Sequence, residues 1–191
     1  MMKKILVIDN YDSFTYNLVH YIEKLTGISP SVFRNDAISI DEVDEYDKIL
    51  LSPGPGVPVD AGICIDLIKK YAPAKSILGI CLGHQAICEA FNGKIRNLSN
   101  VFHGVATPVI ISDNNEPLFR NIPDTIIAGR YHSWAASEED LPDCLKVTCY
   151  DKDGIIMGIS HKDYDVRGLQ FHPESILTEK GIDIIKNWIE I

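Results

Sequence analysis

A cysteine between two glycines, where an apolar run meets a helical pattern, constrains this chain more than any other feature. Residues 79–83 read Gly-Ile-Cys-Leu-Gly, after an apolar run and before helical spacing over 84–91. This is the glycine-x-nucleophile-x-glycine order of a strand-to-helix elbow, with cysteine replacing serine. The turn needs small flanking residues, and the first helical N–H groups favour a thiolate. The pattern predicts strand, turn and helix, with Cys81 as nucleophile; a buried core cysteine is the alternative.

The first half of the chain predicts an α/β fold. Apolar runs predict strands at 4–8, 31–34, 48–52 and 76–80, and helical spacing predicts helices at 15–25, 61–71 and from 82 to about 91. Ser39 and Glu42 form a candidate capping box for a short helix. This alternation predicts an open, mostly parallel, doubly wound sheet flanked by helices, with sites beyond the carboxyl ends of its strands.

The second half predicts a different kind of structure. Short strands with turn signals fill 101–131 and 145–171, which we expect to be antiparallel strands and hairpins added to the parallel core. Ile182, Ile185, Trp188 and Ile189 mark one face of a further helix. The 191 residues contain no repeat, low-complexity segment or linker, so we expect one domain over residues 1–191.

Composition excludes several classes of function. The net charge of −9 and the lack of a basic run disfavour binding to nucleic acid, and no apolar segment reaches membrane-spanning length. Five cysteines, an odd number without a C-x-x-C pair, indicate free thiols in a reducing cytoplasmic compartment. Two pairs could each supply at most half of the ligands of a metal site: Cys81 with His84, and Cys144 with Cys149. No second half accompanies either pair, so we expect no metal.

A base for Cys81 is available at residues 168–175. If this segment is extended, His172 and Glu174 project to the same side, because residues two apart share a face. Pro173 keeps His172 out of the helical region. A ring N–H of His172 would then meet the Glu174 carboxylate, as nucleophilic catalysis by cysteine requires. A solvated surface turn is the alternative.

Three further segments follow predicted strands. Residues 51–56, Leu-Ser-Pro-Gly-Pro-Gly, are either a simple turn or a rigid loop whose backbone supplies one oxyanion donor beside the N–H of Leu82. Residues 9–14 are either polar site residues or a helix start capped by Asp12 or Ser13. At 130–134, His132 is more typical of packing than of catalysis, whereas Ser133 and Trp134 offer contacts to a small substrate.

Together these motifs resemble the class I glutamine amidotransferases, the triad-type glutaminases. Residues 79–85 match the family's nucleophile motif, and 171–174 match its histidine and glutamate. Residues 9–18, 52–56 and 130–133 resemble the chorismate-using branch, the glutaminase subunits of anthranilate synthase and aminodeoxychorismate synthase. The resemblance spans nearly the whole chain, with the motifs in the family's order.

The resemblance implies a flavodoxin-like sheet and a glutaminase that hydrolyses L-glutamine. It implies that Cys81 forms a thioester, His172 transfers protons and Glu174 orients His172. The residues implied around the substrate are Gly54, Pro55, Gly56, Leu82, Gln85, Ser133 and Trp134. It further implies that ammonia passes to a separate chorismate-aminating synthase subunit, that this partner binds magnesium, and that this chain needs no cofactor.

Some alternatives stay open. We favour anthranilate over aminodeoxychorismate as the product, and one chain serving both pathways is a further alternative. A γ-glutamyl hydrolase-like cysteine hydrolase and a non-catalytic scaffolding homologue are more distant; the intact Cys81, His172 and Glu174 argue against the scaffold. Trp134 stands where the family often has leucine, and Val105 where it often has lysine, which affects pocket shape and partner surface respectively.

Overall fold

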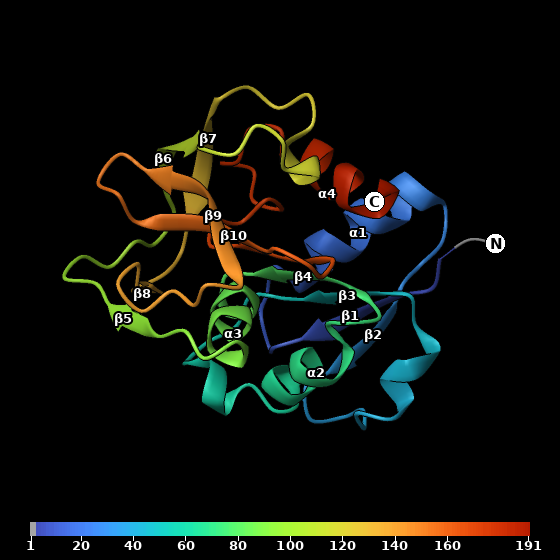
Figure 1. The fold of residues 1–191 in the computed structure, drawn as a ribbon. Helices are drawn as coiled ribbons and strands as arrows, with labels where there is room; N and C mark the ends of the chain where they lie inside the picture. Colours follow the sequence, from blue (N-terminus) through green and yellow to red (C-terminus); the bar gives the residue numbers. More distant parts are fainter. Residues whose placement is uncertain (1–2) are drawn as a thin grey trace.

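The structure is a computed structural model that describes residues 3–191, and within them nine strands form one sheet (Figure 1). The strand order is β2-β1-β3-β4-β11-β10-β9-β6-β7, and β5 and β8 form a separate pair. The strands are β1 (Ile5–Asp9), β2 (Ser31–Arg34), β3 (Lys48–Leu51), β4 (Ser76–Ile80), β5 (Ile95–Asn97), β6 (Val105–Ile111), β7 (Thr125–Arg130), β8 (Trp134–Ala136), β9 (Leu145–Asp151), β10 (Ile156–His161) and β11 (Val166–Leu169). The α-helices are α1 (Thr15–Thr26), α2 (Cys64–Tyr71), α3 (Leu82–Ala90) and α4 (Gly181–Glu190).

Strands β2, β1, β3, β4 and β11 are parallel, which gives the predicted mixed α/β fold with a largely parallel core. Their order follows the flavodoxin-like 2-1-3-4-5 pattern, with β11 in the fifth place. Every residue of β3 and β4 is buried. Strands covered by helices on both faces bury both sets of side chains, which explains why apolar residues dominate them in the sequence.

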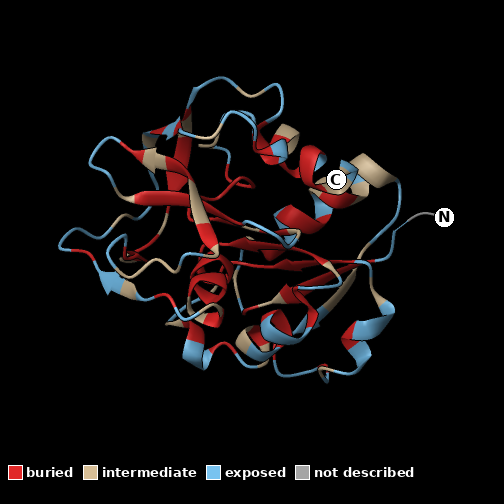
Figure 2. Ribbon diagram, in the orientation of Figure 1, coloured by how far each residue is buried: buried red, intermediate tan, exposed pale blue. Residues whose placement is uncertain are grey.

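Two helical layers cover the sheet, with α2 and α3 on one face and α1 and α4 on the other (Figure 1). Each layer closes its own apolar core, and burial is concentrated along the sheet between them (Figure 2). Helix α3 packs on β4 and β11, the two strands at the centre of the sheet. This packing fixes the start of α3, and therefore Cys81, at the carboxyl end of β4.

The antiparallel half differs from the expectation at one strand. β10, β9, β6 and β7 are joined by antiparallel pairing, as predicted. β11 was expected among the added antiparallel strands, but it pairs parallel to β4 over Val166–Leu169 and antiparallel to β10. That expectation is wrong because strand direction depends on pairing partners distant in the sequence. As a result, β11 delivers the segment after it to the same edge as Cys81.

Two local predictions need adjustment. Helix α2 begins at Cys64 rather than at residue 61, because a 3₁₀ turn at Pro58–Asp60 and Gly62, with its positive φ, precede it. The capping box is present, since Glu42 Oε2 accepts from the Ser39 N–H at 2.9 Å. It precedes a single 3₁₀ turn over Glu42–Glu45 rather than an α-helix, and the N-cap residue of that turn, Asp41, makes no side-chain cap hydrogen bond.

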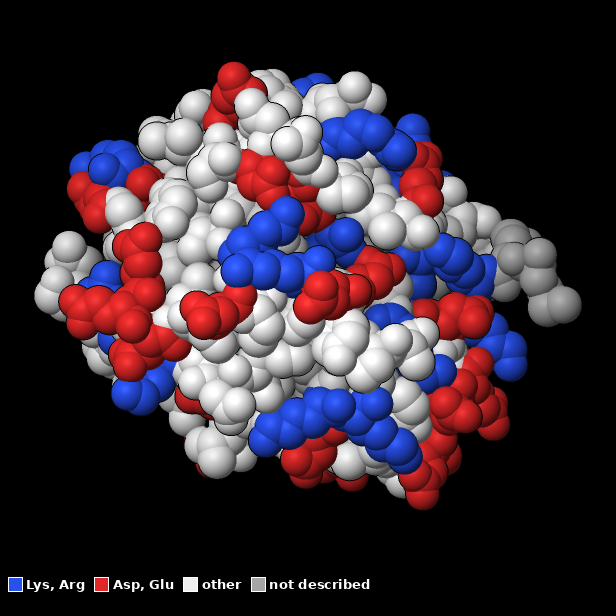
Figure 3. All heavy atoms as spheres, viewed as in Figure 1, with Lys and Arg blue, Asp and Glu red and all other residues white. Residues whose placement is uncertain are grey.

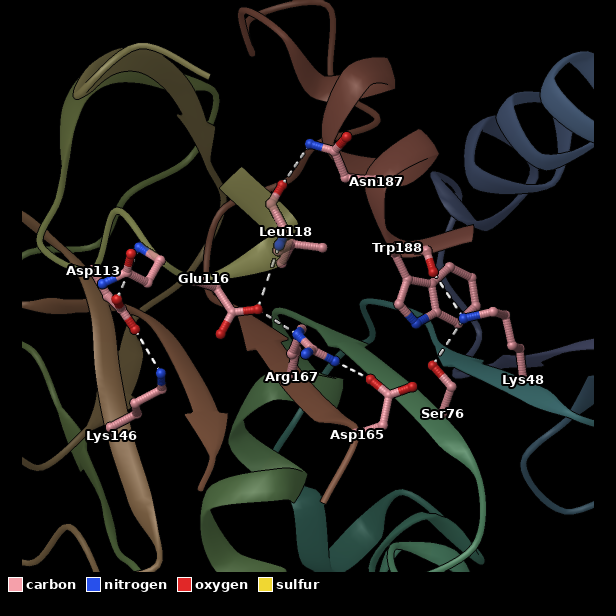
Figure 4. Close-up of polar contacts among 11 residues, drawn as sticks. Lys48, Ser76, Asp113, Glu116, Leu118, Lys146, Asp165, Arg167, Asn187 and Trp188 are labelled. Carbon is pink, nitrogen blue, oxygen red and sulfur yellow. Dashed lines mark hydrogen bonds and ion pairs between the residues drawn. The ribbon is translucent and has the colours of Figure 1, made fainter. Parts of the chain in front are cut away.

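Helix α4 is anchored to the sheet and to the 3₁₀ turn at Pro117–Phe119 by buried polar groups (Figure 4). Lys48 Nζ donates to Ser76 Oγ at 3.0 Å and to the Trp188 carbonyl at 2.8 Å. Burial lowers the pKa of Lys48 to about 8. Asn187 Nδ2 donates to the carbonyls of Leu118 and Arg120. These bonds satisfy carbonyls at the end of α4 and next to it, which apolar packing alone would leave unpaired.

The face shown in Figure 3 carries acidic and basic side chains side by side rather than in one basic patch. Several pair across elements, including Lys146 with Asp113 and Arg167 with Glu116. None of the helices described over residues 3–191 combines the length and the apolar character needed to cross a membrane.

Candidate active site

Cys81 occupies a strained turn between β4 and α3. Its backbone has φ 50° and ψ −100°, in a region that non-glycine residues rarely adopt. A Cβ added at Gly79 would lie 2.3 Å from the Gly83 carbonyl oxygen, and one added at Gly83 would lie 2.5 Å from the Leu51 carbonyl oxygen. The chain can therefore pass through this elbow only with glycine at both flanking positions.

His172 and Glu174 lie in direct contact, with His172 Nδ1 2.7 Å from Glu174 Oε1. Both side chains are buried. The predicted extended conformation is wrong, because the Ser175 N–H bonds to the His172 carbonyl and closes a turn. Pro173 takes the second position of that turn, where its fixed φ is favoured. The predicted contact is therefore present, although a turn rather than a strand produces it.

Aromatic rings enclose the His172 imidazole. The ring centroid of Tyr131 lies 4.8 Å from that of His172, and Phe14 lies 5.7 Å away, both in edge-to-face geometry. Burial would lower the pKa of His172, but the neighbouring Cys81 sulfur and the Glu174 carboxylate outweigh it and raise this pKa above its usual value. The enclosed imidazole is therefore hydrogen-bonded to Glu174 and lies near Cys81, while its Nε2 is buried and has no hydrogen-bond partner among the described side chains.

The glycine-proline loop after β3 reaches the start of α3. A Cβ added at Gly54 would lie 2.7 Å from a Leu82 methyl carbon and 2.6 Å from the Asn10 carbonyl oxygen. Gly54 thus lies beside Leu82, whose N–H is among those that a helix leaves unpaired at its first turn. Pro55 and Gly56 continue the loop and are exposed. Residue 10, the Gly54 loop and α3 therefore meet at one edge of the sheet.

Gln85 and Trp134 are also brought together. Gln85 is buried one turn into α3, and its Nε2 donates to the Trp134 carbonyl at 3.0 Å. Ser133, the preceding residue, uses its carbonyl to accept from the Leu98 N–H.

Two other sequence expectations concern positions near this edge. The alternative that Asp12 or Ser13 caps helix α1 is confirmed only in part, since Asp12 Oδ1 accepts from the Phe14 N–H but α1 has no side-chain cap. Val105 begins β6 and is exposed.

A buried ion pair behind Trp134 was missed by sequence reasoning. Arg130 bonds to Asp151 at 2.6 Å, and its guanidinium stacks on the Phe102 ring at 3.5 Å. Arg130 Nε also donates to His132 Nε2, and His132 Nδ1 contacts the Trp134 carbonyl at 2.8 Å. From the sequence, Asp151 lies in a segment, 145–171, where only strands and turns are expected. Its partner Arg130 lies two strands away, so no local pattern indicates the pair.

Three of the remaining thiols, Cys64, Cys88 and Cys149, are buried and lack the setting of a nucleophile. Burial raises the pKa of Cys64 and of Cys88 to about 12, and burial also raises that of Cys149. All five cysteines are free. Among residues 3–191, no group of three or more histidine, cysteine or acidic side chains lies close enough to hold a metal ion.

Cavity size does not identify the site. A cavity of about 720 Å³ lies at the opposite edge of the sheet, near the amino ends of β1 and β3. Its lining includes Lys4, Ile22, Lys48 and Ile189, and none of the predicted site residues. The candidate site is instead identified by the convergence of chemically matched groups at the carboxyl edge.

Two buried neutral histidines near this edge predict a loss of stability in acid. Burial lowers the pKa of His84 to about 3, and burial followed by the Arg130 charge lowers that of His132 to about 4. Below pH 6.5 the unfolded chain takes up these protons and the folded chain does not, so the free energy of unfolding falls as pH falls. His172, whose pKa is raised, stays protonated in the folded chain and gains its proton in the unfolded chain only near pH 6.5, so between pH 8 and 6.5 it acts in the opposite direction.

From pH 8 to pH 5, each of these two histidines should reduce the free energy of unfolding by about 2 kcal/mol. Urea unfolding at several pH values measures the slope. His132→Gln should reduce the total change by the His132 share of about 2 kcal/mol, while His20→Gln, at an exposed position, should leave the slope unchanged. Equal slopes in wild type and His132→Gln would contradict the assignment.

Comparison with known proteins supports the resemblance that the motifs suggest. The family model described as glutamine amidotransferase class-I matches residues 6–191. The chain belongs to the class I glutamine amidotransferases. A solved structure of this fold is that of a putative GMP synthase subunit from Thermoplasma acidophilum, with TM-score 0.88 and 28% identity over 100% of this chain and 94% of that one.

Relatives with names from both chorismate pathways match at similar identity. Aminodeoxychorismate synthase component 2 of Escherichia coli is 45% identical over 97% of this chain and 98% of its own length. Anthranilate synthase component 2 of Thermus thermophilus is 45% identical over 98% of this chain and 92% of its own length. The Bifunctional protein TrpGD of Thermotoga maritima, 43% identical, is longer, and the match spans 100% of this chain but 33% of that protein.

Proposed function

We propose that this amidotransferase chain is the glutaminase component of a chorismate-aminating synthase. The observation that carries the proposal is the strained Cys81 elbow beside the hydrogen-bonded pair His172 and Glu174. The names of the relatives, component 2 of anthranilate or aminodeoxychorismate synthase, supply the partner class. L-glutamine is the proposed substrate, with glutamate and ammonia as products.

In the first half of the proposed reaction, the Cys81 sulfur attacks the side-chain amide carbon of glutamine. The carbonyl π pair moves to oxygen, and the backbone N–H groups of Leu82 and of the Gly54 loop stabilise this oxyanion. His172 gives its proton to the amide nitrogen, the C–N bond breaks and ammonia leaves. Glu174 keeps the imidazole oriented through the 2.7 Å bond to Nδ1.

In the second half, water attacks the thioester carbon while His172 takes a proton from it. The C–S bond then breaks, and its electron pair returns to the sulfur of Cys81. Gly54, Pro55, Gly56, Gln85, Ser133 and Trp134 are the proposed contacts to glutamine. A Cβ added at Gly54 would lie 2.7 Å from a Leu82 methyl carbon, so the loop lies against the start of α3, which supports placing the substrate at this junction. This chemistry requires no cofactor in the chain, and magnesium is expected in the synthase.

The synthase is proposed to dock over the carboxyl edge of the sheet, near residues 10–14. Tyr11 is 47% exposed there, and Ile176, two residues after Glu174, is 98% exposed. A partner covering this edge would remove both apolar side chains from water. Phe14 contacts the His172 ring, so a partner on this surface would lie directly above the proposed base. Such docking would also let ammonia pass to the synthase without being protonated in bulk water.

We favour anthranilate as the product made with the partner, with aminodeoxychorismate, or both, as the alternative. Glutaminase turnover should be measured for the isolated chain, then with each candidate synthase and chorismate. The correct synthase should raise turnover by about 10²–10³-fold, the effect of completing one oxyanion donor. If the isolated chain already has full glutaminase turnover and neither synthase changes it, the proposed coupling to a synthase is wrong.

A matched pair of surface variants tests the docking edge. Ile176→Glu places a charge at the carboxyl edge and should weaken stimulation by the synthase, with little effect on the isolated chain. Ile28→Glu changes an exposed isoleucine beside the cavity at the opposite edge and should behave as wild type. If Ile28→Glu blocks stimulation and Ile176→Glu does not, the docking edge has been misplaced.

A further inference from the structure

Gln170 is a buried amide in the middle of the candidate site that the reaction above does not use. It is fully buried, in the segment between β11 and His172, and its backbone N–H donates to the Met157 carbonyl at 2.9 Å. Its side-chain Nε2 lies 3.5 Å from Cys81 Sγ, and its Oε1 lies 3.2 Å from Gln85 Nε2. The amide therefore joins the proposed nucleophile to a proposed substrate contact.

The orientation of this amide follows from a chain of hydrogen bonds that begins at Arg130. Arginine has only donors, so His132 Nε2, 3.1 Å from Arg130 Nε, must accept. A neutral imidazole has one acceptor and one donor nitrogen, so His132 Nδ1 carries the hydrogen. That hydrogen is donated to the Trp134 carbonyl at 2.8 Å.

The same logic extends from Trp134 to the sulfur. A carbonyl oxygen only accepts, so Gln85 must present its NH₂ group to Trp134, at 3.0 Å. The second hydrogen of that NH₂ group is donated to Gln170 Oε1. Gln170 therefore has its own NH₂ group left for Cys81 Sγ. Turning the Gln170 amide over would set two NH₂ groups against each other in a buried site, which is costly.

We propose that Gln170 is a further catalytic residue, whose amide NH₂ group donates a hydrogen bond to the Cys81 sulfur whenever that sulfur is negatively charged. The inference rests on the proposed role of Cys81 as nucleophile. The sulfur is charged before it attacks glutamine and again when it leaves the thioester, and hydrogen bonds to charged groups are the stronger ones. In the thioester the sulfur is a poor acceptor, so the bond favours both forming and releasing the thiolate.

Gln170 does not compete with His172 for the proton of Cys81. Its NH₂ group offers no acceptor to the sulfur, and its only acceptor oxygen is already taken by Gln85. The two residues therefore have separate roles, with His172 moving the proton and Gln170 holding the charge that the proton leaves behind. The buried ion pair of Arg130 with Asp151 fixes the far end of the chain and keeps this polarity.

The test is the pH dependence of Cys81 alkylation by iodoacetamide, which reports thiolate without glutamine or synthase. Gln170→Met keeps the length of the side chain and removes the donor. The pH midpoint of alkylation should rise by about one unit, and the rate at pH 6 should fall about tenfold, the lower end for a bond to a charged group. Cys81→Ser measures labelling at the other thiols, and melting temperature checks folding.

Two further variants keep the test decisive if Gln170→Met does not fold. Gln170→Glu preserves the shape and the bond from Gln85 but turns a carboxylate towards the sulfur, so its midpoint should rise further than in Gln170→Met. Gln85→Met frees the Gln170 amide to turn and should shift the midpoint part of the way. Ser160→Ala removes a buried hydroxyl from β10, outside the site, and should keep the wild-type profile.

A wild-type alkylation profile in the folded Gln170 variants would overturn the inference, even if their melting temperatures fall, because a purely structural amide affects stability alone. This outcome leaves the proposed glutaminase standing. Conversely, a shifted profile in a chain that never hydrolyses glutamine would support the hydrogen bond and overturn the proposed function. The two failures are therefore distinguishable.

Discussion

Cys81→Ser should abolish glutamine-dependent activity, with a loss of about 10⁴-fold or more in turnover, the scale seen when a catalytic nucleophile is removed. Serine at the elbow keeps the strained backbone and the flanking glycines, so the fold should survive. A hydroxyl lacks the acidity of a thiol, and the His172 beside it cannot supply a thiolate-like nucleophile. Glutamate release with the synthase present measures the effect.

Three controls make this result specific. The variant mixed with its synthase should still support synthesis from added ammonia, because the proposed function places amination on the partner. A chloroketone analogue of glutamine should label wild type at residue 81 alone. Cys144→Ser, at a half-buried thiol outside the site, should keep wild-type turnover. Wild-type turnover in Cys81→Ser would end the assignment of the nucleophile.

Much of the parallel core could be predicted because its signals are local. β2 and β4 have the bounds expected from the sequence, Ser31–Arg34 and Ser76–Ile80. β4 is a short apolar run followed by a helical pattern, and β2 has Val32 and Phe33 between Pro30 and Asn35, so one window of sequence contains each signal. Gly79 and Gly83 likewise predicted the elbow correctly, since a Cβ at either position would collide with backbone.

The parallel direction of β11 could not be predicted in the same way. The segment 145–171 contains strand and turn signals throughout, which favours hairpins. β9 and β10 do form a hairpin, but β11 inserts between β10 and β4, and its Val166 pairs with Ile77, 89 residues earlier in the chain. No local pattern records that pairing. Only the coverage of β4 and β11 by α3 shows why the arrangement is favourable.

In the candidate site, too, contacts between residues close in the sequence could be predicted and contacts between distant segments could not. The contact of His172 with Glu174 is within three residues of chain, so it could be predicted even though the turn was not. The chain from Asp151 through Arg130, His132 and Gln85 to Gln170 joins four separate segments, so sequence reasoning missed it. One signal was present, since Gln170 lies between Leu169 and Phe171, both fully buried. A polar residue between two core residues indicates a buried hydrogen bond.

The second large effect is expected at His172, with a distinctly smaller one at Glu174. His172→Ala removes the group that moves protons in both halves of the proposed reaction, so turnover should fall by about 10⁴-fold or more. Glu174→Ala leaves the imidazole in place, still held between Tyr131 and Phe14, and removes only the carboxylate that orients and stabilises its charged form. Its loss should be about ten to a hundred times smaller, as for the orienting member of other triads.

Turnover of each variant should be measured with the synthase present, beside ammonia-dependent synthesis as the check on folding and docking. Glu174→Gln completes the series, because it keeps the shape at the 2.7 Å contact and removes the charge. Its turnover should lie between that of wild type and that of Glu174→Ala, because the carboxylate both orients the imidazole and stabilises its charge. The loss of turnover should therefore be largest in His172→Ala, smaller in Glu174→Ala and smallest in Glu174→Gln. This order is expected if His172 alone transfers protons and the buried Glu174 carboxylate supports it. An equal loss of turnover at both positions, or a larger loss at Glu174, would show that proton transfer has been assigned to the wrong residue.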